Sequence, residues 1–82
     1  PFNQETTIEY VVPIAETVEL IIYNLLGQQV RNLLNAQLAP SVYRSRWDGR
    51  NDLGLIAPSG LYFVRLRAAG RFEATQKILL VR

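Results

Sequence analysis

Hydrophobic and polar residues alternate along most of this chain, a period-two pattern that predicts β-strands with one buried face. The alternation is clearest in four segments, which span Thr7 to Val12, Val18 to Tyr23, Val42 to Trp47 and Leu61 to Ala68. Every second side chain is expected to face the core, and these inward residues are Ile8, Tyr10, Val12, Val18, Leu20, Ile22, Tyr43, Ser45, Trp47, Tyr62, Val64, Leu66 and Ala68. The residues between them are expected to face outward.

The segment from Gln28 to Leu34 does not alternate, and it fits two kinds of structure. Its apolar residues Val30, Leu33 and Leu34 have the spacing of a short helix, but they also fit a strand that contains a β-bulge. We favour the bulged strand because the neighbouring segments are strands. The residues just before it, Asn24 to Gly27, predict a tight turn whose glycine takes a positive φ angle.

The end of the chain predicts a β-hairpin. Glu73 to Arg82 is expected to form the last strand, and the loop Ala69 to Arg71 joins it to the strand before. A three-residue loop brings core positions together; the inward pairs are Ala68 with Phe72, Leu66 with Ala74 and Tyr62 with Ile78. The outward pairs are then Arg67 with Glu73, Phe63 with Lys77 and Leu61 with Leu79. A two-residue loop is disfavoured because it would place Glu73 opposite the core residue Leu66.

This register leaves an apolar strip on the outer face of the hairpin. The outer strip consists of Leu61, Phe63, Leu79 and Val81, and its basic border consists of Arg65, Arg67 and Lys77. Exposed apolar patches of this kind usually mark contact surfaces, so the outer strip is a candidate docking site. The alternative is that a preceding domain or the N-terminal segment covers it.

Strands of this number and spacing, separated by Gly, Pro and Asn, predict an all-β fold: a small antiparallel Ig-like β-sandwich of six to seven strands. The 82 residues are enough for a single domain, 1–82, and the absence of cysteine means that it has no disulfide. Trp47 is the expected core anchor. Because Trp47, Tyr62 and Tyr10 all fall on inward positions, core packing is favoured over a sugar-stacking platform.

The composition removes several kinds of chemistry. The chain has neither Cys nor His, which excludes thiol nucleophiles, imidazole catalysis and the usual zinc sites, and its seven acidic residues are scattered. We therefore expect no catalytic residues and no cofactor. The net charge of +2 rests mainly on arginine, which suits carboxylate or phosphate binding, although a solvated strand surface is the simpler explanation. The sequence contains no nucleic-acid recognition pattern and no apolar run that could span a bilayer.

The segment Asp48 to Gly54 is rich in oxygen ligands, like a calcium-binding loop, but it departs from that pattern. Arg50 stands where a ligand is expected, Leu53 replaces the turn glycine, and Ser59 replaces the bidentate acid. We therefore expect no metal site. The polar residues are expected instead to form side-chain-to-backbone turns; they are Asp48, Asn51 and Asp52.

A series of short motifs covers nearly the whole chain. They are Pro1-Phe2-Asn3-x-Glu5-Thr6-Thr7-Ile8-x-Tyr10, Val18-x-Leu20-x-Ile22-Tyr23-Asn24-x-x-Gly27-x-x-Val30, Trp47-Asp48-Gly49 with Gly54, Ser59-Gly60-Leu61-Tyr62 and Lys77-Ile78-Leu79-Leu80-Val81-Arg82. In this order and at these spacings, the chain resembles the C-terminal sorting domain of the type IX secretion system. That domain is similar in turn to the Ig-like domain of flagellar hook-capping proteins.

The resemblance implies a non-catalytic module of a larger secreted protein, such as a hydrolase, in a Gram-negative bacterium of the Bacteroidetes type. Such a module directs its cargo across the outer membrane to the cell surface. Its implied partners are the type IX secretion machinery, a sortase-like peptidase that cleaves it, and the surface lipopolysaccharide to which the cargo becomes attached. The implied sorting and recognition residues are Gly60, Tyr62, Lys77, Leu79, Val81 and Arg82.

The chain departs from the family pattern at its start. Gln4 stands where Pro is common, and Pro1 lies inside the usual opening motif. We therefore expect a piece of a longer protein from which most of the linker where cleavage falls is missing. We also expect a monomer that neither spans the membrane nor binds nucleic acid. Two other functions stay open: a carbohydrate-binding module, which needs outward aromatic residues, and a structural Ig-like module of a multidomain extracellular enzyme.

Overall fold

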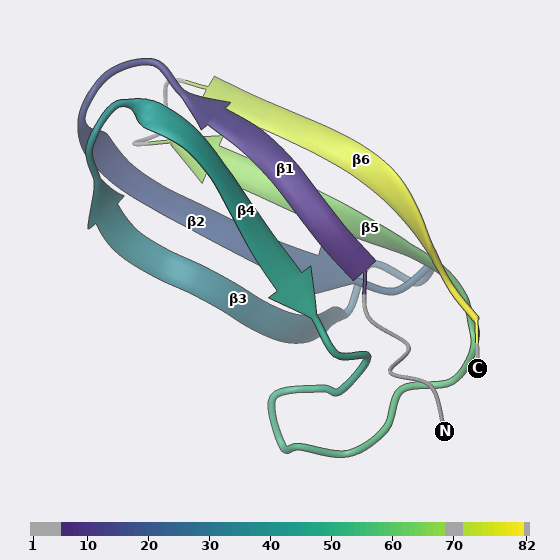
Figure 1. Ribbon diagram of the computed structural model, residues 1–82. Coiled ribbons are helices and arrows are strands. Elements are labelled where there is room, and N and C mark those ends of the chain that lie inside the picture. Colours follow the sequence, from purple (N-terminus) through teal and green to yellow (C-terminus); the bar gives the residue numbers. More distant parts are fainter. Residues whose placement is uncertain (1–5, 69–71, 82) are drawn as a thin grey trace.

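The computed structural model describes residues 6–68 and 72–81, and these residues form six β-strands and no helix (Figure 1). The strands are β1 (Thr6–Val12), β2 (Glu16–Tyr23), β3 (Gln29–Leu38), β4 (Ser41–Trp47), β5 (Gly60–Ala68) and β6 (Phe72–Leu80). Their number agrees with the six to seven strands that the alternating pattern predicts.

Two sheets of unequal width pack face to face (Figure 1). The narrow sheet contains β1 and β4, and the wide sheet has the strand order β3-β2-β5-β6. Neighbouring strands run antiparallel in both sheets. The predicted fold class, a small all-β antiparallel sandwich, is therefore confirmed.

The core lies between the sheets and is built mainly from the side chains that the alternation placed inward, with Ala57 added by the loop before β5. Its buried members are Ile8, Tyr10, Val12, Val18, Leu20, Ile22, Trp47, Ala57, Tyr62, Val64, Leu66, Ala68, Ile78 and Leu80. Trp47 is fully buried, as predicted, and its ring meets that of Tyr62 edge-on with the centroids 5.0 Å apart. The indole N–H of Trp47 donates a hydrogen bond to the backbone carbonyl of Arg50 at 2.9 Å, so its one polar atom is satisfied.

The ambiguous segment is a strand, and its pairing explains why it looked helical. The register between β2 and β3 shifts twice, between Leu20 and Ile21 and again between Ile22 and Tyr23. Because these irregularities break the strict alternation of β3, Val30, Leu33 and Leu34 can all pack against the core. The preference for a bulged strand is confirmed, as is the positive φ angle of the turn glycine, Gly27, at 81°.

The C-terminal hairpin has the predicted register. Ala68 pairs with Phe72 and Leu61 pairs with Leu79, as a three-residue loop requires. Residues 69–71 and Arg82 lie outside the described residues. The last strand is shorter than predicted, because β6 ends at Leu80, the partner of Gly60, where β5 begins. Val81 follows the strand and has no pairing partner on β5.

One position on β6 that is predicted to face the core is not buried. Ala74 pairs with Leu66 as expected, but it is exposed, and so is Gln76. The physical reason is the difference in width between the sheets: β6 is an edge strand of the wide sheet, and the narrow sheet does not cover its central part. The side chain of Phe72, also predicted to face inward, lies outside the described set.

We predict that Leu20→Ala lowers the free energy of unfolding by about 3 kcal/mol, because it removes a fully buried side chain from a thin core. A domain of this size has only roughly 4–12 kcal/mol in total. Urea unfolding followed by Trp47 fluorescence measures the change. The matched control is Leu26→Ala, at a side chain that is 82% exposed, which should cost less than about 0.5 kcal/mol. Equal effects of the two substitutions would contradict the assigned core.

Candidate interaction surface on the C-terminal hairpin

The outer strip lies where the hairpin register predicts it. Leu61 pairs with Leu79, and Phe63 pairs with Lys77, so these side chains share the face of the wide sheet that points away from the core. Leu61 is 43% exposed and Leu79 is 60% exposed, while Phe63 is half-buried. Val81 is 57% exposed just beyond the end of β6. The strip is thus an apolar surface open to solvent at the C-terminal end of the described chain.

The basic border of the strip is organised around one carboxylate. Glu73 accepts hydrogen bonds from Nε and Nη2 of Arg65 at 2.9 and 2.6 Å, and Nε of Arg67 lies 3.3 Å from the same oxygen. Hydrogen bonding to Glu73, and secondarily to Tyr23, raises the pKa of the Arg65 guanidinium. Among the described residues, no acidic group lies within ion-pair distance of Lys77. Lys77 is therefore the border cation that has no carboxylate partner in this part of the chain.

The strip continues towards the turn between β2 and β3, which the sequence analysis did not include in the surface. A shallow groove of about 250 Å³ lies there, with Tyr23, Leu25, Phe63 and Arg65 among its lining residues. Tyr23 pairs with Phe63 across the sheet, and Leu25 is exposed in the turn. The signal in the sequence was the pair of leucines in a turn, where polar residues are more usual.

Gly60 and Tyr62, by contrast, do not belong to the outer face. Tyr62 is only 4% exposed, and its hydroxyl donates a hydrogen bond to the carbonyl of Pro58 at 2.5 Å. Gly60 has a φ angle of 150°, which side chains rarely permit, at the point where the loop enters β5. These two residues fix the start of β5, and Lys77, Leu79 and Val81 are the implied sorting residues that reach solvent.

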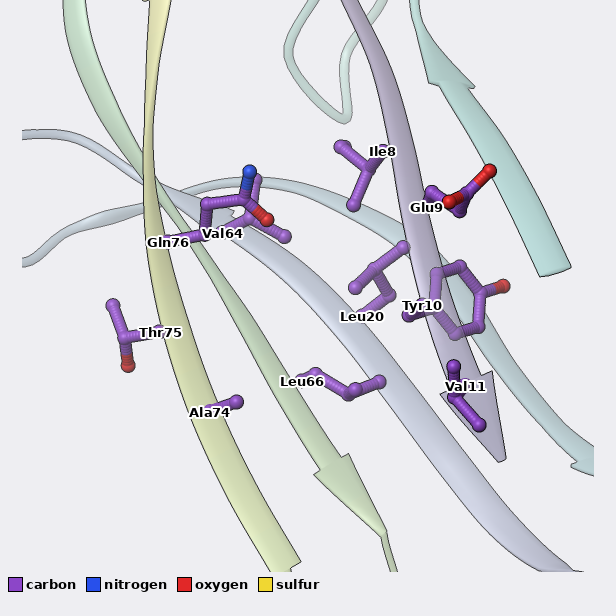
Figure 2. Close-up of a pocket in the computed structure, with 10 residues that line it drawn as sticks. All are labelled: Ile8, Glu9, Tyr10, Val11, Leu20, Val64, Leu66, Ala74, Thr75 and Gln76. Carbon is purple, nitrogen blue, oxygen red and sulfur yellow. The ribbon is translucent and has the colours of Figure 1, made fainter. Parts of the chain in front are cut away.

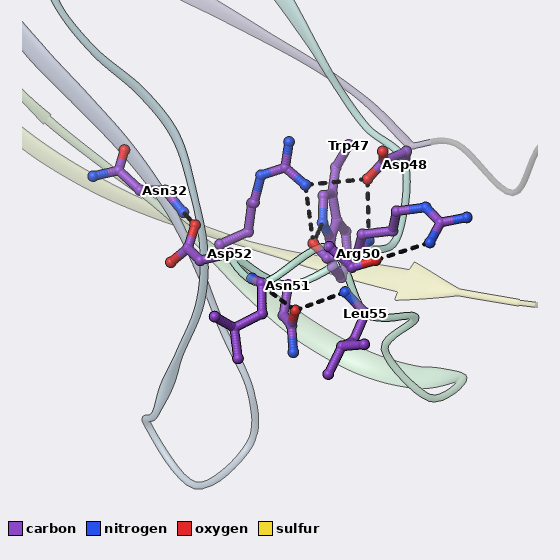
Figure 3. A network of polar contacts seen from close by, with 10 residues as sticks. Asn32, Trp47, Asp48, Arg50, Asn51, Asp52 and Leu55 are labelled. Atoms are coloured by element: carbon purple, nitrogen blue, oxygen red, sulfur yellow. Dashed lines mark hydrogen bonds and ion pairs between the residues drawn. The ribbon is translucent and has the colours of Figure 1, made fainter.

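The loop between β4 and β5 is held by a polar network (Figure 3). Oδ1 of Asp48 accepts the backbone N–H of Arg50 at 3.1 Å, as a side-chain-to-backbone turn requires. Asp52 instead bonds across to β3, where its Oδ1 accepts the N–H of Asn32 at 2.9 Å and its Oδ2 accepts the amide of Gln29 at 3.0 Å. Its predicted local turn is thus replaced by a contact that ties the loop to the bulged strand.

Two turns at this end of the sandwich have the same structure. In each, an Asn side-chain oxygen accepts the backbone N–H groups two and four residues later, at 2.9 Å for Asn24 and 3.0 Å for Asn51. A glycine follows three residues after each Asn, with φ angles of 81° at Gly27 and 83° at Gly54. The turn predicted at Asn51 is therefore confirmed. The shared spacing Asn-x-Leu-Gly is the sequence signal for the repetition, which we had not predicted.

Neither metal-binding nor membrane-spanning elements are found in the described part of the chain. Within residues 6–68 and 72–81, no three side chains of Asp, Glu, His or Cys gather in the way that a metal ion would need. The same residues form no helix that is long and apolar enough to cross a bilayer. The carboxylates of Asp48 and Asp52 are engaged with backbone and side-chain donors.

Fold and surface together define a small β-sandwich in which most of the exposed large apolar residues gather at one end. No protein-family model and no curated protein sequence match the chain. Among solved structures it is similar to FlgD from P. aeruginosa, a flagellar hook-capping protein, with a TM-score of 0.67 and 22% identity over 93% of this chain. The chain spans 60% of the length of that protein. This likeness shows the fold alone, and it agrees with the Ig-like class that the motifs implied.

We predict that Asn51→Ala lowers the free energy of unfolding by about 1–2 kcal/mol, because two backbone N–H groups lose their acceptor. Chemical denaturation measures the loss. The matched control is Asn35→Ala at an exposed position on β3, which should change stability by less than about 0.5 kcal/mol. If both variants were equally stable, the Asn-centred turn would be an incidental feature of the loop.

We also predict that the pKa of Asp52 in the folded protein lies below the ordinary value of about 3.9. The hydrogen bond from the Asn32 backbone is the main cause, and that from Gln29 is the second. Since the folded-state pKa is lowered, the stabilisation is present above about pH 4 and is lost as the pH falls through the lowered pKa. Titration of the carboxyl ¹³C resonance tests this, and Gln29→Ala should raise the pKa part of the way. A folded-state pKa at or above the ordinary value would contradict the assigned hydrogen bonds.

Proposed function

We propose that this domain is the C-terminal sorting module of a larger secreted protein and directs that protein through type IX secretion to the cell surface. The observation that supports this best is the outer strip, where Leu61, Leu79 and Val81 are 43–60% exposed on adjoining segments. Burying such side chains in a partner yields roughly 25 cal/mol per Å² of apolar area, so an exposed strip favours association. The motif resemblance supplies the identity of the partner, the type IX machinery.

The sorting residues divide into two roles in this proposal. Lys77, Leu79 and Val81 contact the machinery, because they lie on the open face or at the end of the hairpin. Gly60 and Tyr62 keep the hairpin in place through the loop conformation and the contact with Trp47. A sortase-like peptidase then cleaves the module, and the cargo becomes attached to surface lipopolysaccharide. The domain itself needs no catalytic group for this role.

The carbohydrate-binding alternative has less support, because its candidate aromatic rings are inside. Trp47 and Tyr62 pack against each other, and Tyr10 stacks on Tyr43 with ring centroids 5.9 Å apart. A structural Ig-like module is the stronger competitor, since the likeness to FlgD concerns the fold that both functions share. A sorting module needs the outer strip for export, whereas a structural module does not.

The test is a secretion assay in a host with the type IX machinery. A passenger protein with a signal peptide is fused to this domain, and surface display is measured by antibody labelling of intact cells. We predict that Lys77→Ser combined with Leu79→Ser and Val81→Ser removes most of the surface signal. Because all three side chains are exposed, the substitutions should cost little stability, and this is checked by thermal unfolding of the purified domain.

The matched control lies on the outer face of the narrow sheet. Val11→Ser, Val42→Ser and Arg44→Ser also remove two exposed aliphatic side chains and one cation, and they should leave surface display unchanged. Wild-type display of a well-folded Lys77–Leu79–Val81 variant would show that the strip is not the recognition surface. No display of the wild-type fusion would favour the structural module instead.

A further inference from the structure

Beyond the outer strip, the sandwich has an incomplete side between β1 and β6. A groove of about 430 Å³ runs between these two strands (Figure 2). Among the described strands, β1 pairs only with β4, and β6 pairs only with β5. Each of them therefore keeps one hydrogen-bonding edge free of any described strand, and the groove lies beside both.

The groove has buried core residues at its bottom and exposed residues along its rim. Leu20, Val64 and Leu66 of the wide sheet form its floor, and Ile8 and Tyr10 stand on the β1 side (Figure 2). Ala74 of β6 points into the groove from the other side. Thr75 also lines the groove, but its side chain points away from it (Figure 2). Ala74 is exposed although its position in the pairing faces inward. An apolar floor beside a free strand edge is the arrangement that accepts an additional strand.

We propose that this groove binds an extended segment of a partner protein, which pairs with the free edge of β1 and places alternate aliphatic side chains over Leu66 and Ala74. An extended polypeptide fits because a strand next to β1 would lie about 4.8 Å away and would present side chains to the groove at every second residue. Its backbone supplies both the donors and the acceptors that the open edge of β1 requires. This site is separate from the outer strip and does not depend on the sorting role.

The charge at the rim defines the partner further. Glu9 lines the groove from the outward positions of β1, where its carboxylate is held by Arg44 at 3.0 Å and stays largely exposed. A residue of the added strand directly opposite Glu9 would meet this carboxylate, and opposite charges across a strand pair are favourable. The partner segment therefore alternates aliphatic residues with polar ones and carries Lys or Arg at the position that faces Glu9.

The experiment uses the peptide acetyl-Thr-Val-Thr-Val-Lys-Val-Thr-amide as the probe and follows backbone amide shifts of the labelled domain by NMR. We expect shifts along β1 and β6. One further peptide carries N-methyl groups on its odd residues, and another carries them on its even residues. Because successive N–H groups of a strand point to opposite edges, each of these peptides lacks the donors along one edge. One of the two should bind at least about fivefold more weakly, since each lost hydrogen bond costs roughly 1 kcal/mol. Replacing Lys by Glu in the probe should also weaken binding.

Two substitutions on β6 complete the test. Ala74→Trp fills the groove and should abolish binding, whereas Thr75→Trp, at the adjacent residue that points away, should leave it unchanged. The amide spectrum of each variant shows whether the fold is intact. The proposal is overturned if the probe shifts no residue of β1, if both N-methylated peptides bind like the parent, or if the Lys and Glu probes bind equally. It is also overturned if the groove is occupied by a second copy, seen as a dimer that Ala74→Trp dissociates.

Discussion

A two-stranded sheet covers a four-stranded one in this domain, and much of its surface chemistry follows from that difference in width. Where β1 and β4 lie over the wide sheet, inward residues such as Val18, Leu20 and Ile22 are fully buried. Beyond the edge of the narrow sheet, Ala74 faces the same side of the wide sheet but is exposed, because no described strand covers it there. The groove beside β1 is thus a direct result of the fold, because a sheet of two strands cannot cover the whole inner face of a sheet of four.

The loop from β4 to β5 closes one end of this sandwich and depends on Trp47. The Trp47 ring packs against Tyr62, and its N–H holds the carbonyl of Arg50, so the loop is fixed at both its start and its end. Asp52 adds a third attachment, to the bulged part of β3. Packing and hydrogen bonding act together here: the apolar contact places the loop, and the backbone bonds define its path.

Most of the exposed large apolar residues gather at the same end. Leu26 and Leu53 occupy equivalent positions in the two Asn-centred turns and are 82% and 83% exposed, and the outer strip lies beside the first turn. A small domain that exposes this many large side chains in one region has a surface suited to binding another molecule. The inward aromatic rings, in contrast, serve the core. Function in this fold is therefore sought on its edges and at its open end.

The sequence by itself determined most strand positions and inward faces, because period-two alternation assigns each side chain to one face of its strand. It also determined the hairpin register, because the alternative loop would place charged Glu73 opposite the core residue Leu66. It also indicated the turn at Gly27, since only glycine takes that φ angle freely. Tertiary structure alone decided the exposure of Ala74, the attachment of Asp52 to Asn32 and the position of Leu25 beside Phe63. These depend on which strands lie at the sheet edges and which loops meet, and local pattern carries no information about either.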